Sequence, residues 1–140
     1  MLTIACKILK PNARMPQRAK YNDLALDVYA LEEGCVYPGG RTEIKTGIAL
    51  ETMPECGFLI KERSGHARQG LFCLGGVIDP GYRGELLVVL ANFGFKDVQW
   101  NAGDRIAQLI PIPFTPSMTC QADELSESER GEQGFGSTGR

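Results

Sequence analysis

The apolar residues of this 140-residue chain recur mainly in short runs, and several runs alternate with polar residues at a period of two. This alternation is typical of β-strands that have one face on a hydrophobic core. It is clearest in RTEIKTGIAL, where every second residue from Thr42 to Ile48 falls on one face and Glu43 and Lys45 fall on the other. The run LLVVL, residues 86–90, is apolar at every position, which predicts a strand covered on both faces. The patterns predict strands over residues 2–9, 24–31, 41–52, 57–62, 71–74, 85–93 and 105–114.

Glycine- and proline-rich turn signals separate these runs, at residues 38–40, 53–57, 79–84 and 101–104. The helical candidates are short, around residues 64–70 and 122–130. Many short strands at this spacing predict an all-β sandwich or barrel. The composition turns polar after Phe114, so we expect a compact body over residues 1–122 and an arm over residues 123–140.

Composition and charge narrow the possible functions. The formal net charge of −2 provides no basic footprint for nucleic acid, and no apolar run is long enough to cross a membrane. The chain opens without the pattern of a secretory signal. Five cysteines without a Cys-x-x-Cys pair, and a single histidine, make a zinc site improbable. We expect free, partly buried thiols in the cytoplasm or another reducing intracellular compartment, and no secretion.

Two segments in the first half of the chain carry candidate chemistry. Asp27 interrupts the apolar strand ALDVYA, either as an exposed acid or as a carboxylate that helps to hold a divalent cation. Arg63, Ser64 and Gly65 follow a predicted strand and precede a short helix. They form either an anion site or an ordinary turn in which Ser64 is the N-cap.

Two further segments follow. GGVIDPGYRGELLV predicts a β-hairpin with Asp79 and Tyr82 at its tip. Asp79 either starts the turn or acts as a general base on water, and the Tyr82 ring could lie against a ligand. In NAGDRIAQLIPI, Arg105 and Gln108 flank an apolar strand, and the segment taken alone is a turn followed by a strand.

The C-terminal strip RGEQGFGSTGR has two interpretations. It is either a frayed terminus or a lid whose glycine N–H groups, Arg130, Ser137 and Thr138 approach phosphate, while Phe135 stacks on a ring.

Taken together and in order, these segments resemble the five motifs of the trimeric dUTPases: ALDVYA, RSG, GVIDPGYRGELLV, GDRIAQLI and RGEQGFGSTG. The resemblance implies a distorted β-sandwich of jelly-roll type and a homotrimer whose active sites each draw on three subunits. It also implies hydrolysis of dUTP to dUMP and diphosphate in the presence of Mg²⁺. The tail would then be an arm that closes over a bound triphosphate.

The resemblance also assigns roles to residues. Asp79 would activate the attacking water, and Asp27 would hold water on the Mg²⁺ ion. Tyr82 would lie under the deoxyribose, and the arm residues would reach the phosphates and cover the uracil. The substrate-binding set that it implies is Arg63, Ser64, Gly65, Gly76, Val77, Ile78, Tyr82, Gln108, Arg130, Phe135, Gly136, Ser137 and Thr138.

Two alternatives share this fold. A dCTP deaminase, or a bifunctional deaminase–dUTPase, would need a glutamate in the strand after the turn, where this chain has Val89. A catalytically idle dUTPase-like domain that binds a protein would not need Asp27, Asp79 and Tyr82, all of which are present.

Overall fold

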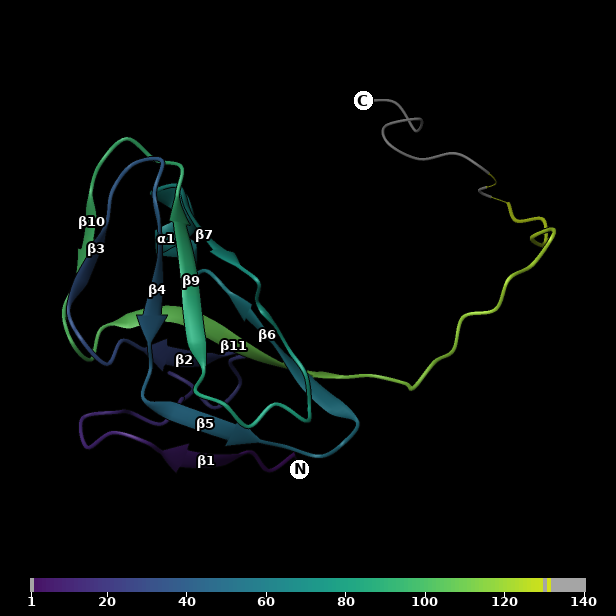
Figure 1. The fold of residues 1–140 in the computed structure, drawn as a ribbon, viewed down its shortest axis with the longest axis horizontal. Coiled ribbons are helices and arrows are strands. Elements are labelled where there is room, and N and C mark those ends of the chain that lie inside the picture. Colours follow the sequence, from purple (N-terminus) through teal and green to yellow (C-terminus); the bar gives the residue numbers. More distant parts are fainter. Residues whose placement is uncertain (1, 130, 132–140) are drawn as a thin grey trace.

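The computed structural model describes residues 2–129 and residue 131 of the chain. Antiparallel strands and one short helix make up its regular structure (Figure 1), which confirms the all-β class predicted from the alternation. The elements are β1 (Ala5–Ile8), β2 (Leu26–Tyr29), β3 (Gly34–Val36), β4 (Arg41–Lys45), β5 (Ile48–Glu51), β6 (Cys56–Lys61), α1 (Ser64–Arg68), β7 (Leu71–Leu74), β8 (Val77–Ile78), β9 (Leu87–Asn92), β10 (Val98–Trp100) and β11 (Arg105–Pro113).

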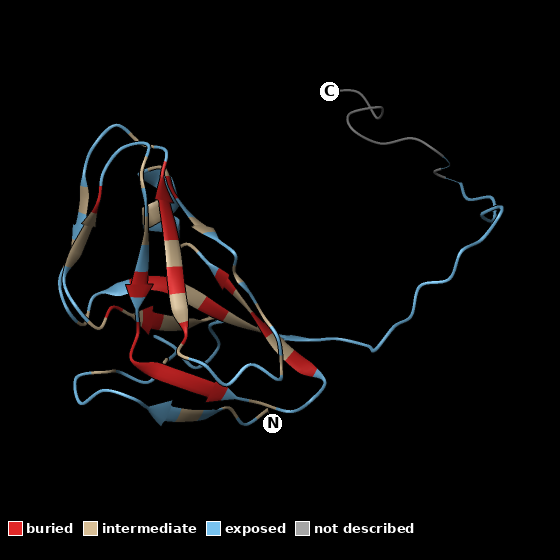
Figure 2. Ribbon diagram, viewed as in Figure 1, coloured by how far each residue is buried: buried red, intermediate tan, exposed pale blue. Residues whose placement is uncertain are grey.

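Two larger sheets form the body, and two strand pairs accompany them. The larger sheets have the strand orders β2-β11-β6-β8 and β4-β9-β7, and the pairs are β1-β5 and β10-β3. The core draws on both larger sheets, with Val28 and Leu109 from the first and Val88 and Leu90 from the second, each at most 1% exposed. Burying a side chain of this size contributes about 1.5–3 kcal/mol. Figure 2 shows buried residues along β5, β6 and β9.

Every run predicted as a strand contains one, and the differences have local causes. The run over residues 41–52 divides into β4 and β5 because Gly47 adopts a φ of +69°, which bends the chain between them. The strands β3 and β10, each of three residues, were not predicted, whereas β8, of two residues, is the predicted strand before Asp79. The helix expected near residues 64–70 is α1. The prediction of a helix near residues 122–130 is wrong for the part that the structure describes, because residues 122–129 are exposed and not helical.

The predicted hairpin at Asp79 is also wrong. The strand before the turn, β8, pairs with β6, whereas the strand after it, β9, pairs with β4 and β7. Residues 79–86 therefore connect two sheets and do not join paired neighbours. The sequence also predicts that LLVVL is covered on both faces, and within one chain this is not so. One face is buried, but Leu87 and Val89 on the other are only half-buried.

The C-terminal segment leaves the body after β11. The N–H of Phe114 donates to the carbonyl of Glu55 at 2.9 Å, and residues 115–129 are exposed (Figure 1). The division into a body and an arm at residue 122 remains a prediction.

All five cysteines are free, as expected, and their exposure ranges from buried Cys56 to exposed Cys120. Burial, with a smaller contribution from the nearby Glu62 carboxylate, raises the pKa of Cys73 to about 12. Cys73 is therefore a poor nucleophile at neutral pH. Within the described residues, no helix is long and apolar enough to cross a membrane.

Candidate active site

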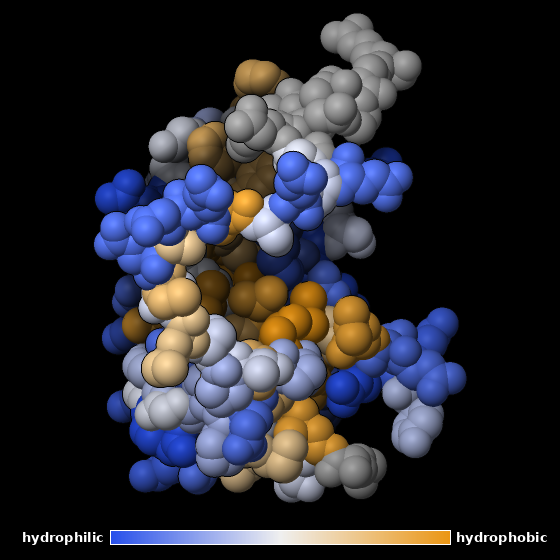
Figure 3. Space-filling model, turned by 90° about the vertical axis from the view of Figure 1, so that its right-hand side faces the viewer, coloured by the Kyte–Doolittle hydropathy of each residue, from blue (hydrophilic) through white to orange (hydrophobic). Residues whose placement is uncertain are grey.

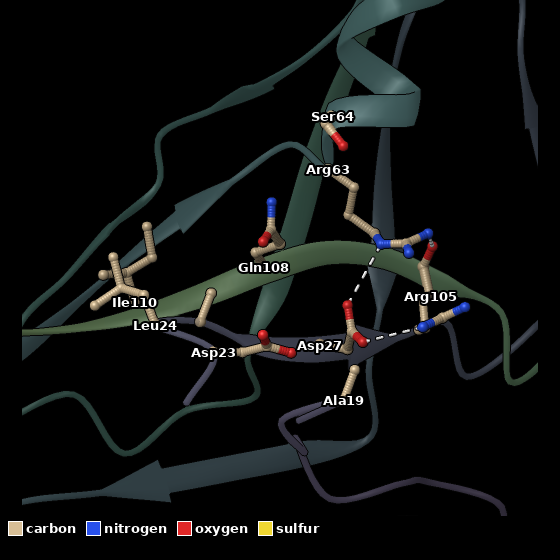
Figure 4. A pocket seen from close by; sticks show the side chains of 10 residues that line it. Ala19, Asp23, Leu24, Asp27, Arg63, Ser64, Arg105, Gln108 and Ile110 are labelled. Atoms are coloured by element: carbon tan, nitrogen blue, oxygen red, sulfur yellow. Dashed lines mark hydrogen bonds and ion pairs between the residues drawn. The ribbon is translucent and has the colours of Figure 1, made fainter. Parts of the chain in front are cut away.

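A polar pocket of about 400 Å³ opens where β2, β11 and the start of α1 meet (Figure 4). It brings together four residues that the motifs singled out separately, Asp27, Arg63, Ser64 and Gln108. The side chains and backbone that line it belong to Ala19, Asp23, Leu24, Ala25, Asp27, Arg63, Ser64, Arg105, Gln108 and Ile110.

Strand alternation directs Asp27 into this pocket. Its neighbour Val28 is fully buried in the core, so the Asp27 side chain points to the opposite face of β2. The carboxylate is 13% exposed and has two cationic partners. Arg63 Nε lies 3.4 Å from Oδ1, and Arg105 Nη1 lies 3.4 Å from Oδ2. The Asp27 carboxylate thus lies between two arginines in the pocket, and one of them remains beside it when the other binds elsewhere.

Gln108 faces Asp27 across the ladder between β11 and β2. Its Nε2 donates to the carbonyl of Glu62 at 3.0 Å, which ties β11 to the residue just before Arg63. The same side chain therefore lines the pocket and fixes the position of the loop that carries Arg63 and Ser64.

Ser64 is not the N-cap of α1, as the alternative of an ordinary turn required. Arg63 is the N-cap and makes no capping bond from its side chain, and Ser64 is the first helical residue. The Ser64 hydroxyl lies at the pocket (Figure 4), and Gly65 is exposed beside it. A serine that lines a pocket with two arginines can donate to an anion.

His66 and Glu62, on either side of this tripeptide, were not predicted as site residues. His66 Nδ1 lies 3.1 Å from the carbonyl oxygen of Ile106, which links α1 to β11. Burial, and to a smaller extent the charge of Arg63, lowers the pKa of His66, so the ring is neutral at pH 7. Burial disfavours the charged form of Glu62, but hydrogen bonds from backbone N–H groups and Lys61 hold its pKa below the ordinary value. Both residues brace the loop from outside the pocket.

The second group of candidate residues lies on β8 and the turn after it. Gly76 is required by a close approach, because a Cβ there would lie 2.4 Å from the carbonyl oxygen of Ile60. Val77 is 71% exposed and Asp79 is exposed. The turn is ordered by the N–H of Tyr82, which donates to the Asp79 carbonyl at 3.1 Å, and by the Tyr82 hydroxyl, which donates to the Glu85 carbonyl at 2.9 Å.

A smaller apolar pocket of about 210 Å³ adjoins this turn. Asp79 and Pro80 line it together with residues of β6, β8 and the end of β11, namely Gly57, Phe58, Leu59, Val77, Ile78, Ile112 and Phe114. Figure 3 views the molecule from the side of this pocket and shows apolar side chains gathered on that face.

The two groups are separated within one chain. Asp27 pairs with Gln108, Gln108 pairs with Lys61, and Ile78 pairs with Phe58, three residues along β6 from Lys61. Three strand spacings and three residues of rise place the Cα atoms of Asp27 and Ile78 about 17 Å apart. The pocket at Asp27 and the turn at Asp79 are therefore distinct surfaces of the same subunit. The arm residues Arg130, Phe135, Gly136, Ser137 and Thr138 lie outside the described residues.

Comparison with known proteins establishes the family. The sequence pattern of the dUTPase family matches residues 11–139. The chain belongs to the dUTPase family. It is 40% identical over 141 residues to the deoxyuridine 5'-triphosphate nucleotidohydrolase of Clostridium tetani, with 99% of this chain and 97% of that protein covered. It is also 40% identical over 144 residues to the enzyme of the same name from Clostridioides difficile, with 99% of each covered.

Solved dUTPase structures have the same fold. A mutant dUTPase of Staphylococcus bacteriophage 80alpha with dUpNHpp superposes with a TM-score of 0.91 at 30% identity, covering 99% of each chain. A mutant dUTPase of phage phi11 of S. aureus, described with a structural Mg(II) ion, gives a TM-score of 0.80 at 26% identity, covering 87% of this chain and 97% of that one. These likenesses confirm the jelly-roll sandwich, and the comparisons support neither the deaminase nor the idle binding domain.

The residues at the pocket suit a Mg²⁺ ion that is bound to the phosphates of the substrate. Among the described residues, no three His, Cys, Asp or Glu side chains gather into a metal cluster. The pocket instead offers the carboxylate of Asp27, with that of Asp23 also in its lining, beside residues suited to phosphate. Mg²⁺ in nucleotide enzymes is usually held in this way, by one or two carboxylates together with substrate phosphates and water.

Proposed function

We propose that the pocket at Asp27 and the turn at Asp79 form the two halves of a dUTP diphosphatase site. As a dUTPase, the protein converts dUTP and water to dUMP and diphosphate with Mg²⁺. The observation that carries the assignment of residues is the convergence of Asp27, Arg63, Ser64 and Gln108 in one pocket from three separate motifs.

The pocket half binds the triphosphate. The Arg63 guanidinium supplies charge-assisted hydrogen bonds, and the Ser64 hydroxyl and the Gln108 amide supply neutral donors. Asp27 would hold Mg²⁺ through its water ligands, and the ion would neutralise charge on the phosphate oxygens and orient the chain. Arg63 then exchanges its carboxylate partner for phosphate.

The turn half binds the nucleoside and activates water. In the four-stranded sheet β8 is an edge strand, so the main chain of Val77 and Ile78 keeps one side free of β6. Those free N–H and C=O groups can pair with the uracil edge and leave cytosine mismatched, while Tyr82 lies against the deoxyribose. The Asp79 carboxylate accepts a proton from the water that attacks the α-phosphorus.

We infer a homotrimer with shared sites, which this division supports. The separation of about 17 Å between the Cα atoms of Asp27 and Ile78 within one chain supports a site in which a second copy brings its turn to the pocket of the first. Apolar surface for such a contact exists beside Asp79, where Val77 is 71%, Ile112 37% and Phe114 44% exposed. A third copy would supply the arm, residues 123–140, beyond the body of residues 1–122. The five free thiols suit a reducing intracellular compartment.

Removal of the arm is expected to lower kcat/KM sharply without unfolding the body. Truncation after Glu129 removes Arg130 and Phe135, which would bring charge to the phosphates and a ring to the uracil. Phe135→Ala should cause part of the loss, by about 1–3 kcal/mol, the cost of one base–aromatic stack. Steady-state kinetics with dUTP measure both variants, and Phe135→Trp is the control that keeps a flat face. A truncated enzyme as active as the full chain would show that the arm is not a lid.

The proposed function is tested by the release of diphosphate from dUTP, dCTP, dTTP and UTP, with and without Mg²⁺. Turnover should be confined to dUTP and should need the metal. A site built on buried hydrogen bonds can discriminate by about 10⁴–10⁵. Release of diphosphate from dCTP at a comparable rate would contradict the base recognition assigned to β8, and no release from any nucleotide would contradict the enzyme itself.

A further inference from the structure

The strand β11 contains an irregularity beside the pocket. In its pairing with β2, Arg105 lies opposite Tyr29 and Ala107 lies opposite Val28, so two residues of β11 advance against one residue of β2. The extra residue is Ile106. A bulge of this kind redirects the side chains that precede it. Both Ile106 and Ala107 are fully buried, although successive strand residues ordinarily face opposite sides.

The bulge places Arg105 on the pocket face. Gln108 and Ile110 both line the pocket, and regular alternation from them would put residue 106 in the pocket and residue 105 in the core. The extra residue reverses this, so Ile106 enters the core and Arg105 lines the pocket with Gln108. Arg105 thereby reaches Asp27, with its Nη1 atom 3.4 Å from Oδ2 (Figure 4).

Each carboxylate oxygen of Asp27 contacts one arginine, and the two arginines differ in whether they stay there when substrate binds. Arg63 belongs to the loop that, under the proposed function, binds phosphate, and it must leave the carboxylate to do so. Arg105 enters from another element and contacts the other oxygen. After Arg63 has moved, Arg105 is the cation that still holds the carboxylate, which is 13% exposed.

We propose that Arg105 is a positioning residue that holds Asp27 in the orientation required for the hydrated metal of the substrate. This inference rests on the proposed function of the pocket. Arg105 acts on the metal only through Asp27, so its effect depends on Mg²⁺. An arginine that contacted the triphosphate directly would contribute whether or not the metal is present.

The test is calorimetric binding of dUpNHpp, a dUTP analogue, to the full-length protein with Mg²⁺ and again with EDTA. Arg105→Gln should weaken binding about three- to five-fold with Mg²⁺ and leave it within about two-fold with EDTA, a range suited to one partly exposed ion pair. In an Asp27→Asn background, Arg105→Gln should have no further effect, because the partner is gone. Arg105→Met, which keeps the aliphatic stem, repeats the test should the glutamine variant fold poorly.

Arg41→Gln is the matched control, since Arg41 is an exposed arginine on β4 in the other sheet. It should bind like the wild type under both conditions. Equal loss with Mg²⁺ and with EDTA in the Arg105 variants would overturn the inference in favour of direct phosphate binding, and no loss in either condition would overturn it outright. A wild-type protein that does not bind dUpNHpp would instead contradict the proposed function.

Discussion

Replacement of Asp79 by asparagine is expected to lower kcat for dUTP by about 10²–10⁴, the usual cost of losing a general base. Asparagine has the shape of aspartate but cannot accept the proton of the attacking water. The turn should persist, because it is ordered by the Asp79 carbonyl and the Tyr82 N–H and not by the carboxylate. The expected variant therefore folds, binds dUTP and hydrolyses it slowly.

Single-turnover kinetics with Mg²⁺ measure the chemical step directly, and binding of dUpNHpp shows whether the site is intact. Asp97→Asn is the matched control, because Asp97 is exposed in the loop before β10 and lines neither the pocket nor the turn. It should retain full activity. A value of kcat for Asp79→Asn within a few-fold of the wild type would remove Asp79 from its role.

Mixing two impaired variants is expected to restore activity. This is the largest gain in rate that two separated half-sites predict. Asp79→Asn would remove the general base from the turn half of the site, and Arg63→Gln would remove a phosphate-binding cation from the pocket half. If each site combines the turn of one subunit with the pocket of another, half of the turns and half of the pockets are intact in an equal mixture. About a quarter of the sites should then be fully wild type, given random assembly.

The measurement is the rate of diphosphate release after the two variants are unfolded and refolded together. Arg63→Gln mixed with Gln108→Leu is the control, because both changes lie in the same pocket and no exchange can assemble an intact one. That mixture should stay inactive. If the Asp79→Asn and Arg63→Gln mixture also stays inactive, each site belongs to a single chain and the shared-site proposal is wrong.

Much of the fold could be predicted from the alternation of apolar residues, because one face of most strands lies on the core. The pairing of strands could not, and the hairpin at Asp79 shows why. Neighbouring runs joined by a tight turn usually pair, yet Val77 and Ile78 pair with β6 while the strand after the turn enters the other sheet. Contacts between strands distant in sequence decided the outcome.

The residues that line the pocket were predictable in part, but their arrangement was not. The motifs identified Asp27, Arg63 and Gln108, and the structure brings them together. Their separation from Asp79 depends on strand order and register, which no local pattern reveals. The pattern around Arg105 predicts only a turn and a strand. It does not reveal the bulge, because Ile106–Ala107 and Leu109–Ile110 are both adjacent apolar pairs and only the first accompanies a register shift.

The connection between the two sheets ties the turn at Asp79 to the interior of the protein. Just after the turn, the N–H of Leu86 donates to the Ile48 carbonyl at 2.8 Å, and the Glu85 carboxylate accepts the N–H of Gly47 at 2.8 Å. Heating that breaks these two bonds would free the turn while the strands on either side of it remain paired. The enzyme should therefore lose turnover at a temperature below its melting transition.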